Sequence, residues 1–466
     1  MYSRNRKSEH NVNGFSTTYR DEVLSRSISQ QCNDERCKFV RCRICFSKIN
    51  EFTTTCRGEA QIQNASDAAY RDMKSRCDVS LRRVHTAGVH GFEFAIKIRG
   101  NMDSFSEDLW QYLGNTRKKI VLYGMGDGAE KIKRVLDDKG IGVAEVMASD
   151  EFVRGHSFLG YKVRKLSEIE ELYGDDFVIL TCFGSQLPQV MEHIYGVAAR
   201  HELYAPCVPV AGDGLFDLEY AKEHSAELKK VYKMLADEQS KRVFENVIRY
   251  KLTGKIDFLR EVETPAEEKF DLLNIGTEEI YVDLGAYNGD TVVEFLNETS
   301  LQFSKIYTME PDVKNYRRMK RALYRIGSAL LECYNCGAWD EDTTVTFNLR
   351  GGRSGSVAPS DAKAADGKSL NPARFREVKM MKTDTMLRGE SATYIKIDVE
   401  GSESRALEGA RNTVSEYKPK LNVALYHRNE DMFALPMMIG EMNRKYKLYM
   451  RHHPYIPDWD TNLYCV

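Results

Sequence analysis

One ten-residue run combines the residue types that bind a small ligand. Residues 282–291, VDLGAYNGDT, follow the apolar run at 279–281 and precede a helix-like pattern at 290–297. A strand that turns sharply through glycines into a helix brings its backbone close to a ligand in open α/β folds. Gly285 and Gly289 carry no side chain there, and Asp283 stands near the carboxyl end of the strand, where such sheets bind ligands. We therefore expect a ligand site in this run.

An acidic residue follows at the end of the next predicted strand. Glu310 comes after the strand-like run at 305–309, about the offset expected for a ribose-binding acid. A carboxylate accepts two hydrogen bonds, which suits a vicinal diol, while Asp283 suits an amino group, directly or through water. A plainer interpretation of Glu310 is an acid at the start of the helix near Pro311 and Asp312.

A second group of polar residues suits proton transfer. Asp398 and Glu400 end the strand-like run at 394–398, and His427 follows the run at 420–426. Carboxylates and imidazole can remove the proton of a hydroxyl acceptor. We predict Asp398, Glu400 and His427 as catalytic residues and assign no metal ligand, although the three could also hold a divalent ion. Structural roles also stay open, with Glu400 capping a helix and His427 bonding a loop.

These motifs, taken in order, resemble the FkbM family of S-adenosylmethionine-dependent O-methyltransferases. The resemblance rests on residues 282–291, Glu310-Pro311-Asp312, 394–401 and Leu425-Tyr426-His427. It implies S-adenosyl-L-methionine as cofactor and a hydroxyl of a sugar, glycan or other polyhydroxylated small molecule as acceptor. Its implied cofactor contacts are Asp283, Gly285, Ala286, Gly289, Asp290, Thr291, Glu310, Asn335, Ala338 and Trp339. Trp339 could instead pack in the core, and Arg353 and Ser354 are predicted acceptor contacts in a polar loop.

A dinucleotide-binding protein is the main alternative. Its fingerprint places glycines as G-x-G-x-x-G, so that a pyrophosphate meets the end of the helix. Here Gly285 is followed by Ala286, Tyr287 and Asn288, which departs from that spacing. The departure favours a cofactor without a pyrophosphate.

The pattern of strands and helices that would position these residues predicts an α/β fold with two Rossmann-like units. Residues 276–466 alternate strand-like and helix-like runs and end in two strands, 446–451 and 462–466, joined by a loop. Strands joined without a crossover helix are most simply antiparallel. A parallel sheet that ends in an antiparallel hairpin is the class I methyltransferase layout. Residues 213–275 are predicted as a helical connector.

We predict that residues 102–212 form the first Rossmann-like unit, which would be an accessory domain. The strand at 119–123 is followed by a glycine turn with Gly124, Gly126 and Gly128 and then a helix. The unit resembles small domains that precede sugar-modifying transferases, which implies a nucleotide or nucleotide sugar at the turn. A purely structural or dimerising role, giving a homo-oligomer, is the alternative.

Composition sets the remaining limits. The chain has 466 residues, a net charge of −2 and 42% hydrophobic residues, which argues for several cored domains without a global attraction to nucleic acid. No apolar run could span a bilayer and no signal peptide is recognisable, so we expect a cytoplasmic protein that binds neither nucleic acid nor membrane. Residues 1–101 are polar, basic and cysteine-containing, which predicts disorder or an extended gene model with a natural start at Met102.

We thus predict an S-adenosylmethionine-dependent O-methyltransferase. Two other classes remain open: a nucleotide-sugar or dinucleotide binding protein without methyl transfer, and an interaction scaffold that keeps the fold.

Overall fold

The computed structural model describes residues 106–327, 329–348, 356–357 and 375–466. The predicted N-terminal segment, the proposed start at Met102 and the predicted acceptor contacts Arg353 and Ser354 lie outside these residues.

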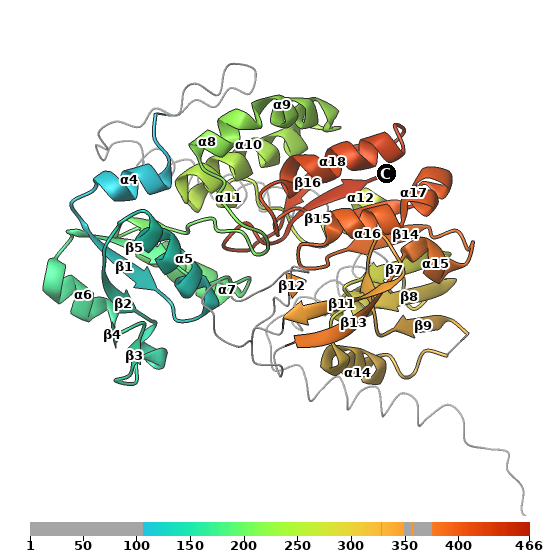
Figure 1. Ribbon diagram of the computed structural model, residues 1–466, viewed down its shortest axis with the longest axis horizontal. Coiled ribbons are helices and arrows are strands. Elements are labelled where there is room, and N and C mark those ends of the chain that lie inside the picture. Colours follow the sequence, from blue (N-terminus) through green and yellow to red (C-terminus); the bar gives the residue numbers. More distant parts are fainter. Residues whose placement is uncertain (1–105, 328, 349–355, 358–374) are drawn as a thin grey trace, which may run out of the picture. The chain divides into compact units, whose positions relative to one another are not determined.

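A six-stranded sheet is built by the first Rossmann-like unit, in the order β3-β4-β2-β1-β5-β6 (Figure 1). All neighbouring strands are parallel except β3 and β4. Strands and helices alternate because each crossover helix returns the chain to the same end of the sheet. The elements are α4 (Leu109–Asn115), β1 (Lys119–Tyr123), α5 (Asp127–Asp138), β2 (Val143–Met147), a 3-10 turn (Asp150–Phe152), β3 (Ser157–Phe158), β4 (Tyr161–Arg164), α6 (Leu166–Tyr173), β5 (Phe177–Thr181), α7 (Pro188–Ala198) and β6 (Leu203–Tyr204).

Both faces of this sheet are covered, as expected for parallel strands. Ile120 and Leu122 of β1 pack with α4 and α5, whereas Val121 and Tyr123 point to the opposite face and pack with α6 and α7. The alternation follows from the two-residue period of a strand. Buried apolar side chains on both sides therefore explain the continuous apolar runs of β1 and β5.

Helices fill the segment between the two sheets. They are α8 (Leu218–Glu223), α9 (Ser225–Met234), α10 (Glu238–Thr253), α11 (Asp257–Arg260) and α12 (Glu268–Leu273). Ion pairs connect them to the end of the chain: Lys251 Nζ lies 2.6 Å from Asp458 Oδ2 in a buried pair, and the buried Arg451 contacts the half-buried Asp237 and Glu268 at 2.8 and 2.9 Å. The predicted domain boundaries within residues 102–466 stay a prediction.

A seven-stranded sheet forms the C-terminal unit, in the order β16-β17-β15-β14-β7-β8-β9. Its elements begin with β7 (Ile280–Leu284), α13 (Asp290–Glu298), β8 (Lys305–Met309), α14 (Val313–Ala322) and β9 (Leu331–Tyr334). They continue with α15 (Thr383–Leu387), β14 (Tyr394–Ile397), α16 (Glu403–Gly409), α17 (Arg411–Tyr417), β15 (Lys420–Ala424), α18 (Asp431–Met442), β16 (Leu448–His452) and β17 (Thr461–Cys465). The predicted α/β class with two Rossmann-like sheets is confirmed.

The last strand is antiparallel, as predicted. β17 pairs antiparallel with both β15 and β16, so the final strand of the chain lies inside the sheet and β16 forms its edge. The other neighbouring pairs are parallel. The carboxyl ends of β7, β8, β14 and β15 therefore meet at one edge, where ligands bind in such folds.

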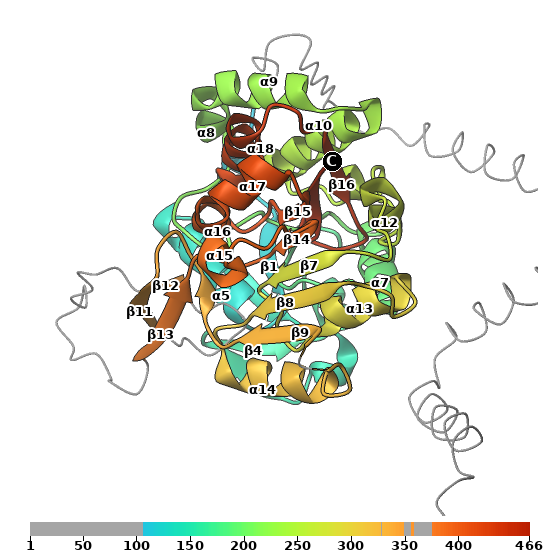
Figure 2. The ribbon, with the colours of Figure 1, turned by 90° about the vertical axis from the view of Figure 1, so that its right-hand side faces the viewer.

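Helices cover the two faces of this sheet (Figure 2). Tyr281 and Tyr394 point to the face covered by α12, α13 and α14, and Val282 and Ile395 point to the face covered by α16, α17 and α18. The rings of Tyr281 and Tyr394 stack with centroids 4.7 Å apart. Both faces of the sheet are packed with apolar side chains, whereas the polar residues lie at the carboxyl ends of the strands.

A third, four-stranded sheet was not predicted. It has the order β10-β13-β11-β12 and consists of β10 (Gly337–Ala338), β11 (Thr343–Asn348), β12 (Ser356–Val357) and β13 (Phe375–Met381). β11 pairs antiparallel with β13 and β12, and β10 pairs parallel with β13. Two of its strands contain two residues each, too few for a recognisable alternation.

Candidate active site

The loop between β7 and α13 approaches the end of β14 very closely. Gly285 has a φ of +83°, and a Cβ there would lie 1.9 Å from the carbonyl oxygen of Asp398. Gly289, with a φ of +90°, is the cap residue that directly precedes α13. Both positions need glycine, but at Gly285 the nearest obstacle is the protein backbone, not only the cofactor that the sequence suggested.

Asp283 organises this loop from beneath it. Its side chain is fully buried, and its Oδ2 accepts a 2.5 Å hydrogen bond from Thr291 Oγ1 while its Oδ1 accepts one of 3.2 Å from Lys396 Nζ. Asp290 is exposed, and its side chain accepts a hydrogen bond from the backbone N–H of Thr291. Ala286 is buried, and its backbone N–H donates to the carbonyl oxygen of Met309. The predicted contact of Asp283 with a cofactor stays a prediction, since both of its oxygens already have protein partners.

Glu310 faces the same loop from the end of β8. Each carboxylate oxygen accepts one backbone hydrogen bond at 2.8 Å, Oε2 from Tyr287 and Oε1 from Asp312. Burial raises the pKa of Glu310 to about 7, although these two N–H groups favour the charged form. A carboxylate has about four acceptor positions, so two remain for the hydroxyls of a ribose.

The three predicted contacts after β9 differ in their surroundings. Asn335 lies beside Glu310, because its Nδ2 donates to the carbonyl oxygens of Glu310 and Pro311 at 2.8 and 3.1 Å. Ala338 and Trp339 are buried, and Trp339 packs with Val378 and Met380. The structure thus shows Trp339 in core packing, and its contact with the cofactor stays a prediction.

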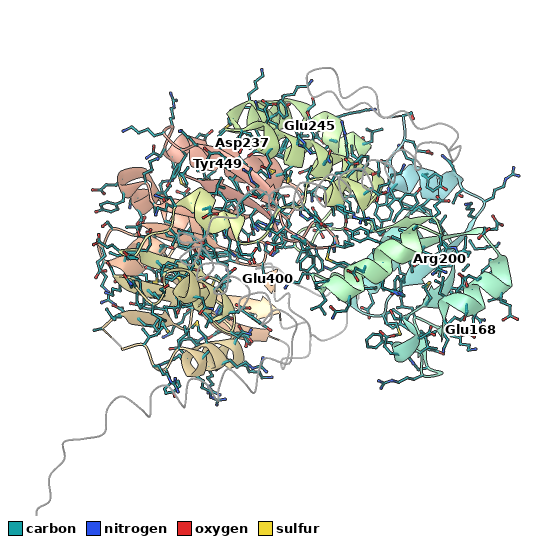
Figure 3. The ribbon with its side chains drawn as sticks, turned by 180° about the vertical axis from the view of Figure 1, so that it is seen from behind. Glu168, Arg200, Asp237, Glu245, Glu400 and Tyr449 are labelled. Carbon is teal, nitrogen blue, oxygen red and sulfur yellow. The ribbon has the colours of Figure 1, made fainter. Side chains whose placement is uncertain are left out.

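The three predicted catalytic residues lie together at the ends of β14 and β15. His427 Nε2 lies 3.6 Å from Asp398 Oδ1 and 3.7 Å from Glu400 Oε2. Asp398 and Glu400 do not meet through a continued strand, because β14 ends at Ile397 and Glu400 has a φ of +53°. The turn nevertheless leaves the side chain of Glu400 partly exposed. Its label lies near the centre of Figure 3.

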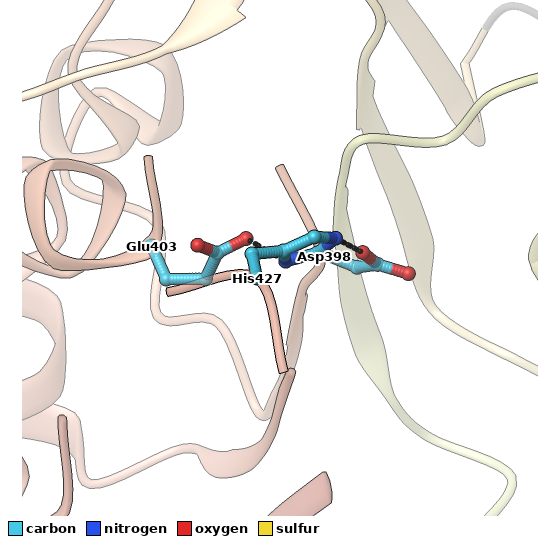
Figure 4. A group of neighbouring side chains, drawn as sticks. All are labelled: Asp398, Glu403 and His427. Atoms are coloured by element: carbon cyan, nitrogen blue, oxygen red, sulfur yellow. Dashed lines mark ion pairs between the residues drawn. The ribbon is translucent and has the colours of Figure 1, made fainter. Parts of the chain in front are cut away.

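Glu403 is a member of this cluster that the sequence analysis missed. Its Oε1 lies 2.9 Å from His427 Nδ1, on the side of the ring opposite Asp398 (Figure 4). The same oxygen accepts from the backbone N–H groups of Val399 and Gly401 at 2.9 and 3.3 Å. Its position three residues after Glu400 on a turn into a helix was the available signal. We name Asp398, Glu400, Glu403 and His427 the acid–imidazole cluster.

The carboxylates of the cluster favour the positively charged form of His427. Burial alone would lower the pKa of His427, but Glu403, Asp398 and Glu400 outweigh it and raise that pKa to about 10. Burial and the charge of Glu403 raise the pKa of Asp431, which lies beneath the cluster, to about 8. Tyr426 donates to Asp398 Oδ1 at 3.3 Å. Three carboxylates therefore surround one imidazole.

Lys396 connects the loop between β7 and α13 to this cluster. Its buried Nζ lies 3.2 Å from Asp283 Oδ1 and 3.8 Å from Asp398 Oδ2, and it donates to the carbonyl oxygen of Gly285 at 3.3 Å. Burial would lower its pKa, but the two carboxylates raise it. The charged form of Lys396 is therefore favoured, and it contacts Asp283 and Asp398 at the same time.

Close packing explains two of the three glycines in the turn of the first unit, Gly124 and Gly128. A Cβ at Gly128 would lie 2.2 Å from the carbonyl oxygen of Cys182, and one at Gly124 would lie 2.7 Å from the ring of Phe183. A Cβ at Gly126 would meet nothing within 4 Å. No comparison supports the predicted nucleotide or nucleotide sugar at Gly124, Gly126 and Gly128, or the predicted homo-oligomer.

The strand order, with the antiparallel β17 inserted beside parallel strands, defines the C-terminal unit as a methyltransferase-like fold. Comparison with family models confirms the class, since residues 283–457 match the methyltransferase FkbM domain. This part of the chain is an FkbM methyltransferase domain that uses S-adenosylmethionine. The free acceptor positions of Glu310 beside the glycine loop fit the ribose of that cofactor.

Solved structures show the same fold. The crystal structure of methyltransferase FkbM from Methylobacillus flagellatus KT is 22% identical, with 75% of this chain and 90% of that chain covered and a TM-score of 0.57. Residues 276–466 are less than half of the chain, so this likeness extends into the preceding elements. No match was found among the curated proteins.

Two further structures are similar over a smaller part. An rRNA methylase from Streptococcus thermophilus is 15% identical over 44% of this chain and 96% of that chain, with a TM-score of 0.28. Fibrillarin from Aeropyrum pernix, in complex with S-adenosyl-L-methionine, is 9% identical over 43% of this chain and 73% of that chain, with a TM-score of 0.26. These scores are too low to add to the assignment.

Among the described residues, no helix is long and apolar enough to cross a bilayer. The expectations of a cytoplasmic location and of no nucleic-acid partner stay predictions.

Proposed function

We propose that the protein transfers the methyl group of S-adenosylmethionine to a hydroxyl of a sugar or another polyhydroxylated small molecule or glycan. One observation carries the proposal: Lys396 bridges Asp283, near the end of β7, and Asp398 of the acid–imidazole cluster. The groups able to take a proton therefore lie beside the loop that would hold the methyl donor.

The reaction requires alignment and the removal of one proton. The acceptor oxygen attacks the methyl carbon in line with the breaking carbon–sulfur bond, S-adenosylhomocysteine leaves, and the hydroxyl proton passes to the protein or to solvent. The side chains of Asp398 and Glu400 are 35% and 43% exposed, whereas that of His427 is 2% exposed. The acceptor therefore approaches the two carboxylates, and the buried imidazole holds them from behind.

The oxygen specificity rests on this cluster and on the FkbM domain. A hydroxyl needs help to lose its proton, and the carboxylates provide it, whereas a dinucleotide-binding protein would have no use for them at this edge. The sugar or polyol class rests on the resemblance to the FkbM O-methyltransferases. The domain match does not favour the alternative of nucleotide binding without methyl transfer.

Methyl transfer to defined acceptors tests the proposal. The full chain is incubated with methyl-labelled S-adenosylmethionine and a panel of free sugars, glycosides and polyols, and products are identified by mass spectrometry. Asp398→Asn is expected to lower turnover at least 100-fold while the affinity for S-adenosylhomocysteine stays unchanged. Asp271→Asn, an exposed acid of α12, is the matched control. Methylation of nitrogen or sulfur acceptors alone would overturn the proposal.

A further inference from the structure

The acid–imidazole cluster has the geometry of a cation site. Among the described residues, Asp398, Glu403 and His427 each offer one ligand atom, and these atoms lie within 4.8 Å of one another. Glu400 adds a further carboxylate oxygen 3.7 Å from His427 Nε2. Oxygen and imidazole nitrogen are the ligands that divalent ions such as Mn²⁺, Zn²⁺ and Mg²⁺ take from proteins.

The distances around His427 Nε2 are too long for hydrogen bonds. Contacts of 3.6 Å to Asp398 Oδ1 and 3.7 Å to Glu400 Oε2 exceed the range of about 2.7–3.2 Å for N–H···O bonds. Two ligands held roughly 2.1 Å from one ion at a tetrahedral angle lie about 3.4 Å apart. The distances from this buried nitrogen to the two carboxylate oxygens are therefore close to the separation of two ligands that share one ion.

The other nitrogen of the ring lies beside a carboxylate at ion-pair distance. Glu403 Oε1 lies 2.9 Å from His427 Nδ1, and the backbone N–H groups of Val399 and Gly401 fix that oxygen. A metal-ligating histidine commonly presents its second nitrogen to a carboxylate, which sets the tautomer and orients the ring. Glu403 is thus placed as the outer partner of His427, with Nε2 directed at Asp398 and Glu400.

Charge and exposure fit this arrangement. Three carboxylates face one imidazole, and the neighbouring cation Lys396 lies nearer to Asp283 than to Asp398. The cluster therefore carries excess negative charge that a dication would offset. Asp398 and Glu400 remain partly exposed on the acceptor side, which leaves an open coordination position, as catalytic metal sites require.

We propose that Asp398, Glu400 and His427 bind one divalent metal ion, with Glu403 as the residue that positions His427. The inference rests on the proposed function: the acceptor hydroxyl takes the open position, and the ion lowers the pKa of that hydroxyl. The hydroxyl proton then passes to solvent, and the acceptor oxygen takes the methyl group. Binding of the ion displaces the Nε2 proton of the imidazole, so it also releases one proton.

Metal binding is measured first, without reference to activity. The full chain, freed of metal by a chelator, is titrated with Mn²⁺ while free Mn²⁺ is followed by electron paramagnetic resonance, and Zn²⁺ is tested by calorimetry. One ion per chain is expected. His427→Gln and Glu400→Gln should each weaken binding at least 100-fold, and Glu403→Gln about 10–100-fold. Glu416→Gln, an exposed acid of α17, is the matched control. Circular dichroism checks that each variant is folded, and the partly exposed Glu400 keeps the test valid if His427→Gln fails to fold.

The outcomes separate this inference from the proposed function. Absence of a stoichiometric ion, or binding that survives both Glu400→Gln and His427→Gln, would overturn the metal site. Methyl transfer to a polyol that persists at full rate in excess chelator would also overturn it and leave the proposed function intact. Stoichiometric Mn²⁺ binding at these residues, without methyl transfer to any hydroxyl, would support the metal site and overturn the proposed function.

Discussion

Lys396 Nζ lies 3.2 Å from Asp283 Oδ1, and both side chains are buried. The contact joins neighbouring strands, since Lys396 pairs with Asp283 in the register of β14 and β7. It also links two parts of the predicted site, because Asp283 accepts a hydrogen bond from Thr291 at the start of α13 and Lys396 reaches Asp398 of the acid–imidazole cluster. The sheet register therefore sets the position of α13 and the loop before it relative to the acid–imidazole cluster.

Removing this cation should destabilise the fold. In Lys396→Met the carboxylate of Asp283 stays buried without its partner, which is expected to lower the free energy of unfolding by about 3–5 kcal/mol. Urea denaturation followed by circular dichroism measures the loss. Lys379→Met, at an exposed position of β13, controls for the loss of a lysine. The double variant Lys396→Met with Asp283→Asn should recover part of the stability, and no recovery would argue against a direct pair.

Cofactor affinity should depend on pH through Glu310. Its pKa is raised to about 7, so below that pH the carboxyl is protonated and loses acceptor capacity for a ribose hydroxyl. We expect the affinity for S-adenosylhomocysteine to fall by up to about tenfold per pH unit below 7 and to be level above 8. Calorimetry between pH 5.5 and 8.5 measures this affinity. Glu310→Gln should bind S-adenosylhomocysteine weakly and equally at every pH. If the affinity of this variant still fell below pH 7, Glu310 would be excluded as the source of the pH dependence.

The close approach at Gly285 gives a steric prediction. Gly285→Ala places a Cβ 1.9 Å from the carbonyl oxygen of Asp398, so the loop must move, and both stability and cofactor binding should be lost. Gly389 has a similar φ of +89°, but a Cβ there meets nothing within 4 Å. Gly389→Ala therefore isolates the conformational cost of about 1–2 kcal/mol. Equal destabilisation of the two variants in thermal unfolding would mean that the contact with Asp398 is unimportant.

The sequence predicted the two Rossmann-like sheets and the antiparallel last strand because period-two burial and glycine turns are local signals. It also located Asp398 and His427 at one edge, since the carboxyl ends of parallel strands converge. It missed Glu403, whose role depends on the turn at Glu400 and Gly401, with φ values of +53° and +94°. Such a turn folds the chain back in a way that spacing alone does not reveal.

Tertiary packing explains the other differences. Residues 403–417 form two short helices, α16 and α17, and not one continuous helix. A Cβ at Gly409 would lie 1.9 Å from the carbonyl oxygen of Trp339, a residue distant in sequence. In the sheet that contains β10–β13, β13 likewise pairs with segments 27 to 43 residues earlier in the chain. Neither relationship leaves a periodic pattern in the chain.

The glycine turn of the first unit can be tested for packing against ligand binding. Alanine normally stabilises a helix relative to glycine by about 0.5–1 kcal/mol. Gly196→Ala in α7, where a Cβ meets nothing within 4 Å, should show that gain. Gly128→Ala in α5 should instead destabilise the protein, because its Cβ would lie 2.2 Å from the carbonyl oxygen of Cys182. Thermal unfolding of both variants measures the difference. A nucleotide or nucleotide sugar that raises the Tm of the unmodified chain, but not that of Gly126→Ala, would show that the turn binds a ligand and does not merely pack.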